Sequence, residues 1–466
     1  MLGAVLGDII GSAYAGQGVR SKDFPLKTPK TRYTGDTVMT LAVARWLLED
    51  PQFTGNWLVH CMQKMRRGNL RAGYDAHLKN WLMAKEPKPY MDMRDGHVAA
   101  RISPVGLYAP TLEEAGLTAR DMAKLTNCHP EAVRGAMAVA ECVFLNRNRT
   151  PQRSSLTKAK EAIRERITSE YGYDLSRSLE EIRIEPLSVA TGMEKDPDIA
   201  EHAAKAITLN CYCVERAITV VLESDTLEDC VRNAVYAGGE PGVIAAIACS
   251  IFAANRECWD ERLMAQFEKY LPHDLQNIME EFEKMVFPTK PTPNSFKVTD
   301  NIYAGEYPRD RDEDKSVNKM KQFERFGISH FIDLTEKGEL ASYKEFLGAG
   351  MSHQRFPIPD VSVPTSTEDV RKLIWEIKRY IEAIPDIKIY IHCWGGVGRT
   401  GTIVGCLLAD MMGYDYDQTI TTLRQLFEDC PKSAYRITPE TQEQCQFIAR
   451  YIDERNQHGN NMTRKA

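Results

Sequence analysis

The spacing of apolar residues changes once along the chain. Over residues 1–285, apolar side chains recur at helical intervals, as in Val38, Leu41 and Leu48 and again over residues 203–222. This spacing places them on one face of a helix, so it predicts helices nearly everywhere in this stretch. We therefore expect residues 1–285 to form an all-α domain.

Residues 286–296 separate this stretch from a second pattern. The segment contains three prolines and few apolar residues, which favours a linker over a helix or a central strand. Beyond it, short β-type runs alternate with helical ones, which predicts an α/β domain with a central, largely parallel sheet over residues 297–457. The polar end, residues 458–466, is expected to be a disordered tail. The expected strands are residues 301–304, 329–334 and 387–392, and the main helix between them is 370–384.

Composition places the chain among globular proteins and limits its partners. Its 466 residues exceed the usual length of one domain, and 43% are hydrophobic and 27% charged, as is typical of water-soluble folds. A formal net charge of −6 gives no general attraction to nucleic acid. We expect neither a nucleic-acid nor a membrane partner, because no apolar run reaches the ~18 residues of a membrane span.

Cysteine usage favours a reducing compartment. The twelve cysteines are scattered and form no C-x-x-C pair, so neither a zinc site nor a disulfide framework is indicated. Residues 1–14 are apolar, but three glycines and Asp8 interrupt them. We therefore expect a buried helix there and not a targeting leader, and the cytoplasm is the expected location.

A glycine-rich turn between a strand and a helix is the clearest candidate site. Residues 388–392 are predicted to be a buried strand and residues 400–412 a helix, and the segment CWGGVGRT, which starts at Cys393, joins them. Successive backbone N–H groups and the positive end of the helix converge in such a turn, so it predicts a phosphate-binding loop. The expected phosphate-binding residues are Trp394, Gly395, Gly396, Val397, Gly398 and Arg399.

The side chains around this phosphate loop suit cysteine-based phosphoryl chemistry. Cys393 lies at the mouth of the loop, where the N–H groups and Arg399 favour the nucleophilic thiolate. Arg399 can hold two phosphate oxygens with its planar fork. Thr400 can donate its hydroxyl to the sulfur of Cys393, and His392 is expected to orient the loop without transferring protons.

The leaving oxygen of a phosphate ester needs a proton, and Asp360 is the candidate donor. It ends the segment Phe356–Asp360, where two prolines stiffen a loop upstream of Cys393. A loop position suits a residue that must close over the substrate. The phosphate loop itself contains no lysine, which argues against polyphosphorylated lipid headgroups. The small domain has no evident segment that would deepen the pocket, so we expect a shallow cleft for phosphoproteins, with small phosphate esters as an alternative.

The loop has the motif H-C-x-x-G-x-x-R-T, which lies between a strand and a helix and follows a loop with an aspartate. On these features, residues 297–457 resemble the dual-specificity branch of the protein tyrosine phosphatase superfamily. The resemblance implies a covalent phosphocysteine intermediate and no metal cofactor. It also implies a glutamine that positions the attacking water, for which Gln442 and Gln444 are the candidates. The alternative is a loop that binds phosphate without turnover. The family's catalytic cysteine, arginine, hydroxyl and acid correspond to Cys393, Arg399, Thr400 and Asp360.

Six segments of the first domain carry a second resemblance. They are Met1–Ser12, Lys22–Leu26, Asp36–Thr40, Ile102–Gly106, Cys128–Glu131 and Tyr171–Leu175. Together they resemble the ADP-ribosylglycohydrolase family over residues 1–285. That family is expected to cleave the glycosidic bond of ADP-ribose with two magnesium ions, which a T-D-D triplet and a late G-G-D-x-D-T motif hold.

The residues that would hold this metal pair depart from the family pattern. The triplet is Thr34–Asp36, with glycine at its centre, and the late motif is Gly238–Val243, so carboxylates are missing from both. The family's asparagine-glycine-serine is replaced by Gly96–Val98, and an acidic residue is replaced by Ala15. Magnesium demands near-octahedral oxygen ligands. We therefore expect the metal to be lost and the domain to be a degenerate hydrolase.

The remaining residues of this vestigial ADP-ribosyl pocket are Thr34, Asp36, His129 and Glu240. Three roles are open for the domain. It is a module that binds ADP-ribose, a nucleotide or an ADP-ribosylated protein, a platform that presents substrate to the phosphatase, or an enzyme rebuilt around Asp36, His129 and Glu240. Retained ADP-ribosyl hydrolysis is a further alternative. A lone histidine in a helix turn is more often structural than catalytic, and Asp8 is also expected to be structural.

Overall fold

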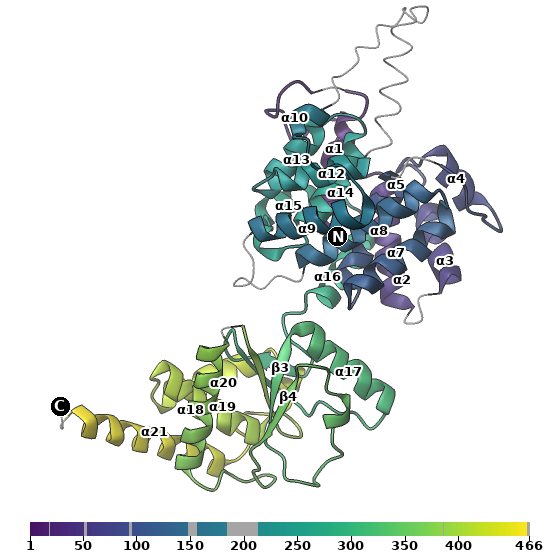
Figure 1. Cartoon of the computed structure of the whole chain (residues 1–466). Coiled ribbons are helices and arrows are strands. Elements are labelled where there is room, and N and C mark those ends of the chain that lie inside the picture. Colours follow the sequence, from purple (N-terminus) through teal and green to yellow (C-terminus); the bar gives the residue numbers. More distant parts are fainter. Residues whose placement is uncertain are drawn as a thin grey trace, which may run out of the picture. The chain divides into compact units, whose positions relative to one another are not determined.

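The computed structural model describes residues 1–17, 19–50, 54–92, 96–147, 156–183, 213–384 and 386–463. The chain divides into two compact units, Met1–Val286 and Phe287–Ala466. In Figure 1 the first runs from purple to teal and the second from green to yellow.

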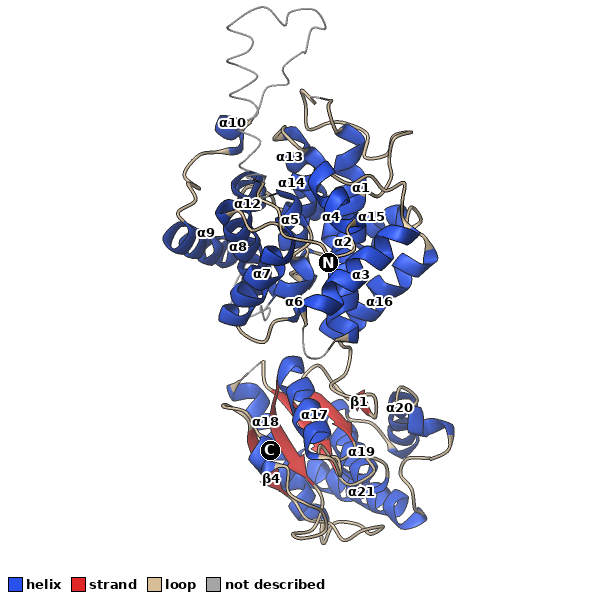
Figure 2. Ribbon diagram, turned by 90° about the vertical axis from the view of Figure 1, so that its right-hand side faces the viewer, coloured by secondary structure: helices blue, strands red, loops and turns tan. Residues whose placement is uncertain are grey.

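The first unit is built from helices, as the apolar spacing predicts (Figure 2). The expected buried helix at the start is present, whereas residues 203–212 of the expected helix 203–222 lie outside the described residues. The helices are α1 (Leu2–Gly11), η1 (Ser12–Tyr14), α2 (Gly35–Glu49), α3 (Gly55–Gly68), α4 (Ala76–Met83), α5 (Gly96–Ala100), α6 (Ser103–Tyr108), α7 (Leu112–Thr126) and α8 (Pro130–Arg147). They continue with α9 (Leu156–Tyr171), α10 (Leu179–Ile182), α12 (Cys213–Leu222), α13 (Leu227–Tyr236), α14 (Pro241–Phe252), η3 (Arg256–Cys258), α15 (Glu261–Glu268) and α16 (His273–Val286).

Helices α1 and α14 pack backbone to backbone at the centre of this unit. Glycines recur at every fourth position of α1 and therefore lie along one side of the helix. A Cβ atom on Gly3 would lie 2.0 Å from the carbonyl oxygen of Cys249, and one on Gly7 would lie 2.1 Å from that of Ala245. Side chains at these positions would force the helices apart. The close packing holds Asp8, on α1, near the start of α14.

The second unit contains a five-stranded sheet with the order β1-β2-β5-β3-β4. Only the pairing of β1 with β2 is antiparallel, so the predicted largely parallel sheet is confirmed. The strands are β1 (Ser295–Lys297), β2 (Ile302–Gly305), β3 (Ile328–Asp333), β4 (Ser352–Arg355) and β5 (Lys388–His392).

Helices cover both faces of this sheet (Figure 2). Alternate residues of β5 point to opposite faces: Ile389 and Ile391 pack with α18, α19, α20 and α21, whereas Tyr390 packs with α17. The chain enters α19 directly after the carboxyl end of β5, at the edge where ligands bind in parallel sheets. The helices are α17 (Glu313–Phe326), η4 (Lys344–Phe346), α18 (Thr367–Ala383), α19 (Gly398–Met412), α20 (Tyr416–Phe427), η5 (Pro431–Ala434) and α21 (Gln442–Thr463).

Two predicted boundaries differ from the structure. Strand β1 takes up Ser295 and the fully buried Phe296, so the linker is shorter than residues 286–296. The three prolines all precede Ser295, which leaves its backbone free to pair with β2. Helix α21 continues through residues 458–463, which were expected to belong to a disordered tail. No proline or other obligate breaker interrupts it there.

Candidate active site

The phosphate loop curls between β5 and α19 and is fixed by backbone contacts. Gly396 has a φ of 75°, which L side chains rarely adopt. A Cβ atom on it would lie 2.3 Å from the carbonyl carbon of Gly305. The backbone N–H of Tyr307 donates to the carbonyl of Trp394 at 3.0 Å, and the Thr438 hydroxyl donates to that of Val397 at 2.9 Å. Glycine is thus required where the loop turns against β2.

Cys393 lies at the base of this loop with its sulfur almost covered. Its side chain is buried, and the backbone N–H of Gly396 donates to Sγ at 3.3 Å. Helix α19 begins at Gly398, so its N-terminal end also faces the sulfur side of the loop. Backbone N–H groups and a helix N-terminus both place positive partial charge beside the sulfur.

Arg399 is buried beside Cys393 and is held by four contacts. Its two η nitrogens make a bidentate pair with the Glu339 carboxylate at 2.8 and 2.7 Å. Nη1 also donates to the carbonyl of Ile358 at 3.0 Å, and Nη2 lies 2.8 Å from the carboxylate of Asp360. Burial opposes the guanidinium charge, but Glu339, Cys393 and Asp360 outweigh it and raise the pKa of Arg399.

The loop that carries Asp360 is anchored by its neighbour Ile358. The backbone N–H of Ile358 donates to Leu334 at 3.0 Å, at the end of β3, and its side chain is fully buried. The Asp360 side chain is 55% exposed, so it can move while the anchor stays. Val361, next to it, has a φ of 59°, a strained conformation for a β-branched residue that is common at functional loops.

His392 is fully buried behind the loop. Its Nε2 lies 2.7 Å from the hydroxyl of Tyr343, and its Nδ1 lies 3.3 Å from the carbonyl oxygen of Cys393. Burial lowers the pKa of His392 to about 4, against the opposing charge of Asp333. A ring held at both nitrogens fits the expected role of His392 in orienting the loop.

Thr400 and the two candidate glutamines lie in different surroundings. The Thr400 hydroxyl is buried and has no hydrogen-bond partner within the described part of the chain, so the expected bond to Cys393 is not formed. Gln444 lines the cavity at the loop, and its amide accepts from the backbone of Glu440 at 2.9 Å. Gln442 is exposed at the start of α21.

A cavity of about 610 Å³ opens over the loop. Cys393, Arg399 and Asp360 line it together, and so does Trp394, whose side chain is exposed at the rim. Further cations line it outside the loop, a feature that the lysine-free loop did not indicate. These are Arg309, Arg311, Lys319, Lys432 and Arg436.

Glu339 is a site residue that the sequence reasoning missed. It lies between β3 and η4, so it follows a strand at the sheet edge where β5 also ends. Acidic residues directly after parallel strands are a signal for such positions, because those strand ends meet at one edge. The segment Thr335–Glu339 contains two such residues, and the sequence alone does not tell which of them faces Arg399.

In the first unit, Asp8 ties α1 to the start of α2. Its Oδ1 accepts from the Thr34 hydroxyl at 2.6 Å, and its Oδ2 accepts from the Thr37 hydroxyl at 2.5 Å and from the Thr34 backbone at 2.8 Å. Burial, reinforced by the charge of Asp36, raises the pKa of Asp8 to about 6. These contacts agree with a structural role for Asp8.

His97 lies between the two remaining carboxylates of the vestigial pocket. Its Nδ1 is 3.2 Å from Oδ1 of Asp36, and its Nε2 is 3.4 Å from Oε2 of Glu240. Burial alone would lower the pKa of His97, but the two carboxylates outweigh it and raise the pKa to about 9. Sequence reasoning noted His97 as a departure from the family pattern and missed this position.

His129, which the sequence grouped with Asp36 and Glu240, has local contacts. Its backbone N–H donates to the side chain of Asn127 at 3.1 Å, and its ring accepts from the backbone of Glu131 at 3.2 Å. It therefore caps the start of α8. No group of three or more His, Cys, Asp or Glu side chains among the described residues is arranged to hold a metal ion.

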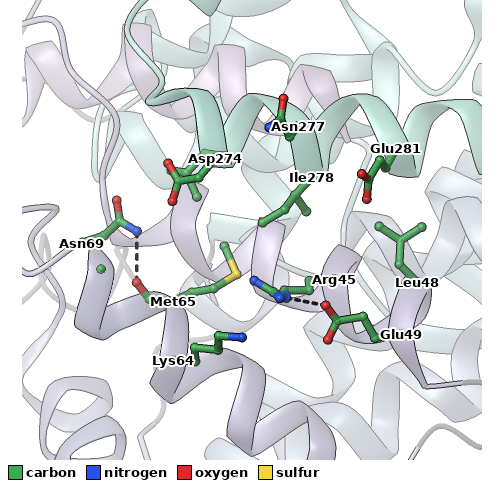
Figure 3. Close-up of a pocket in the computed structure, with 12 residues that line it drawn as sticks. Arg45, Leu48, Glu49, Lys64, Met65, Asn69, Asp274, Asn277, Ile278 and Glu281 are labelled. Atoms are coloured by element: carbon green, nitrogen blue, oxygen red, sulfur yellow. Dashed lines mark hydrogen bonds and ion pairs between the residues drawn. The ribbon is translucent and has the colours of Figure 1, made fainter.

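Another cavity of the first unit, of about 330 Å³, lies among α2, α3 and α16 (Figure 3). Its charged groups come from facing helices, and Arg45 pairs with Glu49 at 2.7 Å inside it. It contains none of the predicted pocket residues.

Across the described residues, no helix is both long and apolar enough to cross a membrane.

Two family models match the chain. Residues 1–284 match the model described as ADP-ribosylglycohydrolase, and residues 309–411 match the one described as polymorphic toxin system, DSP-PTPase phosphatase. Both resemblances drawn from the sequence are thereby confirmed.

Individual proteins are similar over shorter stretches. Protein 067L of Invertebrate iridescent virus 3 is 30% identical over 118 residues, which cover 25% of this chain and 45% of that protein. Protein 197R of Invertebrate iridescent virus 6 is 28% identical over 165 residues, covering 35% and 54%. The names of both propose a tyrosine phosphatase, and the chain spans about half the length of each. The solved structure of Tk-PTP in its active form is 23% identical, with a TM-score of 0.28 over 34% of this chain and 97% of that one.

Proposed function

The chain belongs to the ADP-ribosylglycohydrolase family by its residues 1–284, and we propose that its catalytic activity lies in the second unit, as a cysteine-dependent phosphatase of the dual-specificity type. The substrates are phosphate monoesters, phosphotyrosine first and phosphoserine or phosphothreonine with it. The observation that carries the proposal is the convergence of Cys393, Arg399 and Asp360 on one cavity. A nucleophile, an anion clamp and a proton donor are the groups that phosphoryl transfer without metal needs.

The reaction has two displacement steps. The Cys393 thiolate attacks phosphorus, an S–P bond forms, and the ester P–O bond breaks as Asp360 gives its proton to the leaving oxygen. Arg399 and the loop N–H groups stabilise the charge on the equatorial oxygens. Water then loses a proton to the Asp360 carboxylate and attacks the phosphocysteine, and the thiolate leaves with the S–P electron pair.

Substrate binding requires one contact of Arg399 to be exchanged. Glu339, Ile358 and Asp360 use the N–H groups of both η nitrogens, and within the described contacts Nε is left for a ligand. A fork that grips two phosphate oxygens needs Nε together with Nη2. The half-exposed Asp360 is the mobile partner, so we infer that phosphate takes its place on Nη2. Asp360 is then free beside the leaving oxygen.

The proposal includes a reducing compartment such as the cytoplasm. A thiolate is the form of cysteine most readily oxidised, and oxidation of Cys393 would remove the nucleophile. Phosphoproteins and small phosphate esters are the proposed partners. The exposed Trp394 at the cavity rim offers an apolar surface to the group that carries the phosphate.

Release of phosphate from a small aryl phosphate tests the assignment. We expect turnover by the wild type that EDTA leaves unchanged and that Cys393→Ser abolishes. Cys445→Ser, a half-buried cysteine on α21 outside the cavity, is the matched control and keeps full activity. Activity that survives Cys393→Ser contradicts the mechanism. A wild type without turnover would mean that the loop binds phosphate and does not catalyse hydrolysis.

For the first unit we propose that dimagnesium hydrolysis has been lost. Binding of ADP-ribose or of an ADP-ribosylated protein and presentation of substrate then remain as its roles. Calorimetric titration with ADP-ribose separates them, because a reader of ADP-ribose gives a saturable heat and a platform gives none. Magnesium-dependent release of ADP-ribose would contradict the loss.

A further inference from the structure

The vestigial pocket of the first unit holds a side chain where its family holds metal. We propose that His97 takes the place of the magnesium ions, bridging Asp36 and Glu240 as an internal counter-ion that closes the pocket to divalent cations. The family pattern has glycine at this position of its asparagine-glycine-serine. The presence of His97 and the absence of metal ligands are then two parts of the same replacement.

Three separate elements bring these residues together. Asp36 is in the first turn of α2, Glu240 precedes the first residue of α14, and His97 is on the short helix α5. Each ring nitrogen faces one carboxylate, at 3.2 Å for Asp36 and 3.4 Å for Glu240. The Nδ1 contact with Asp36 has hydrogen-bond geometry, and the Nε2 contact with Glu240 has the geometry of an ion pair. The ring thus contacts both acids at once, and a protonated ring supplies one positive charge against their two negative charges.

The remaining acid of the cluster is not free to hold a metal. Thr34 and Thr37 donate to both oxygens of Asp8 through their hydroxyls and their backbone N–H groups. Magnesium needs several oxygen ligands in near-octahedral positions and gives up its water reluctantly. With Asp36 and Glu240 joined to His97 and Asp8 joined to α2, these residues do not fit a magnesium pair.

The substitutions that remove metal ligands also position His97. A Cβ atom on Gly96 would lie 2.6 Å from Cγ1 of Val243 and 3.1 Å from Cβ of Cys213, so α5 packs directly on α14 and α12. Val243 stands where the family motif has its threonine. Arg101, fully buried, donates to the carbonyl of His97 at 3.2 Å and holds the other side of α5. The apolar side chain of Val243 thus stands where the family has a metal ligand, and it packs against α5, the helix that carries His97.

Returning one lost carboxylate, with and without His97, tests the proposal. Gly242 stands where the family motif has an aspartate, and Gly242→Asp restores it beside Glu240. We expect this variant to give no heat of binding in titration with Mg²⁺, and the double variant with His97→Gly to gain one. Equal binding by the two proteins, or none by either, overturns the proposal.

A second measurement uses stability, so the proposal does not depend on the double variant folding. We expect His97→Gln to lower the melting temperature of the first unit by about 2–4 °C in EDTA, the shift that corresponds to roughly 1 kcal/mol. Millimolar Mg²⁺ should recover part of this loss and leave the wild type unmoved. His273→Gln, on the exposed start of α16, is the control. A His97→Gln protein that melts like the wild type, or a wild type that Mg²⁺ stabilises through Asp36, contradicts the proposal.

Discussion

The two units contain a similar electrostatic arrangement, a basic side chain between two carboxylates, and differ in what that arrangement can do. In the second unit Arg399 lies between Glu339 and Asp360, and in the first His97 lies between Asp36 and Glu240. Both sites lie at helix N-termini, where backbone N–H groups add positive charge.

The difference lies in the mobility of one partner and in the neighbour of the cation. Asp360 is half-exposed on a loop and can yield Nη2 of Arg399 to a phosphate, and Cys393 lies beside it. Asp36 and Glu240 stand on the starts of two helices, α2 and α14, and both oxygens of the neighbouring Asp8 already accept hydrogen bonds. In the second unit, a ligand can therefore displace one carboxylate and bind to Arg399. In the first unit, the contacts of His97 with Asp36 and Glu240 serve to stabilise the packing of three helices.

The strongest test of this contrast is a change of Arg399, the cation whose carboxylate partner Asp360 is exchangeable. We expect Arg399→Lys to lower kcat/KM for an aryl phosphate by about 10³-fold, close to 4 kcal/mol of the barrier. Lysine keeps the charge but not the planar fork that grips two oxygens. Arg436→Lys, at the rim of the same cavity, should change kcat/KM only a few-fold. A loss of equal size at both positions would mean that Arg399 acts as one cation among several.

The buried His392 sharpens the comparison through pH. The pKa of His392 lies at about 4 in the folded protein, below its ordinary value of about 6.5, so the unfolded chain binds the proton first. The free energy of unfolding should therefore fall as the pH drops from about 6.5 to 4, by roughly 3 kcal/mol in total. His392→Gln should flatten this part of the curve in urea unfolding of the second unit.

Exposed His273 is the control for that change, because its ring is in solvent in either state. A wild-type curve that is flat over this window would show that His392 is already protonated in the folded protein. Its role as a neutral bracket between Tyr343 and Cys393 would then be wrong.

The third prediction concerns the exchangeable carboxylate. We expect Asp360→Asn to lower kcat by about 10²-fold for esters with a poor leaving group and less for nitrophenyl phosphate, whose leaving group needs no proton. Inorganic phosphate should inhibit the variant a few-fold more strongly, since it no longer displaces a half-exposed ion pair. Competitive inhibition by phosphate at varied ester concentration measures both effects. Unchanged inhibition would mean that Asp360 and phosphate do not compete for Arg399.

The sequence predicts the phosphate loop and the Asp360 loop, but it does not predict the contacts between segments that are far apart along the chain. The phosphate loop is local in sequence, so the strand, the glycines and the helix start identify Cys393 and Arg399 directly. The Asp360 loop follows from its prolines. Contacts such as Arg399 with Glu339 or His97 with Glu240 join distant segments, and they depend on strand order and helix packing that spacing along the chain does not contain.

The roles of two histidines in the first unit also depend on contacts that the sequence does not show. The sequence showed His97 as a departure from a family pattern, but only the packing of α5 on α14 places its ring between two acids. Sequence reasoning instead grouped His129 with Asp36 and Glu240, although it expected a lone histidine in a helix turn to be structural more often than catalytic. In the structure that ring caps its own helix.

The central claim is that Cys393 carries the phosphoryl group during turnover. Asp360→Asn with nitrophenyl phosphate isolates this step, because the leaving group departs without a proton while hydrolysis of the phosphocysteine lacks its base. We expect a burst of nitrophenolate equal to the enzyme present, followed by slow turnover, and after acid quenching a phosphoryl group on the peptide that contains Cys393. A burst without that adduct, or an adduct on another residue, would contradict the account.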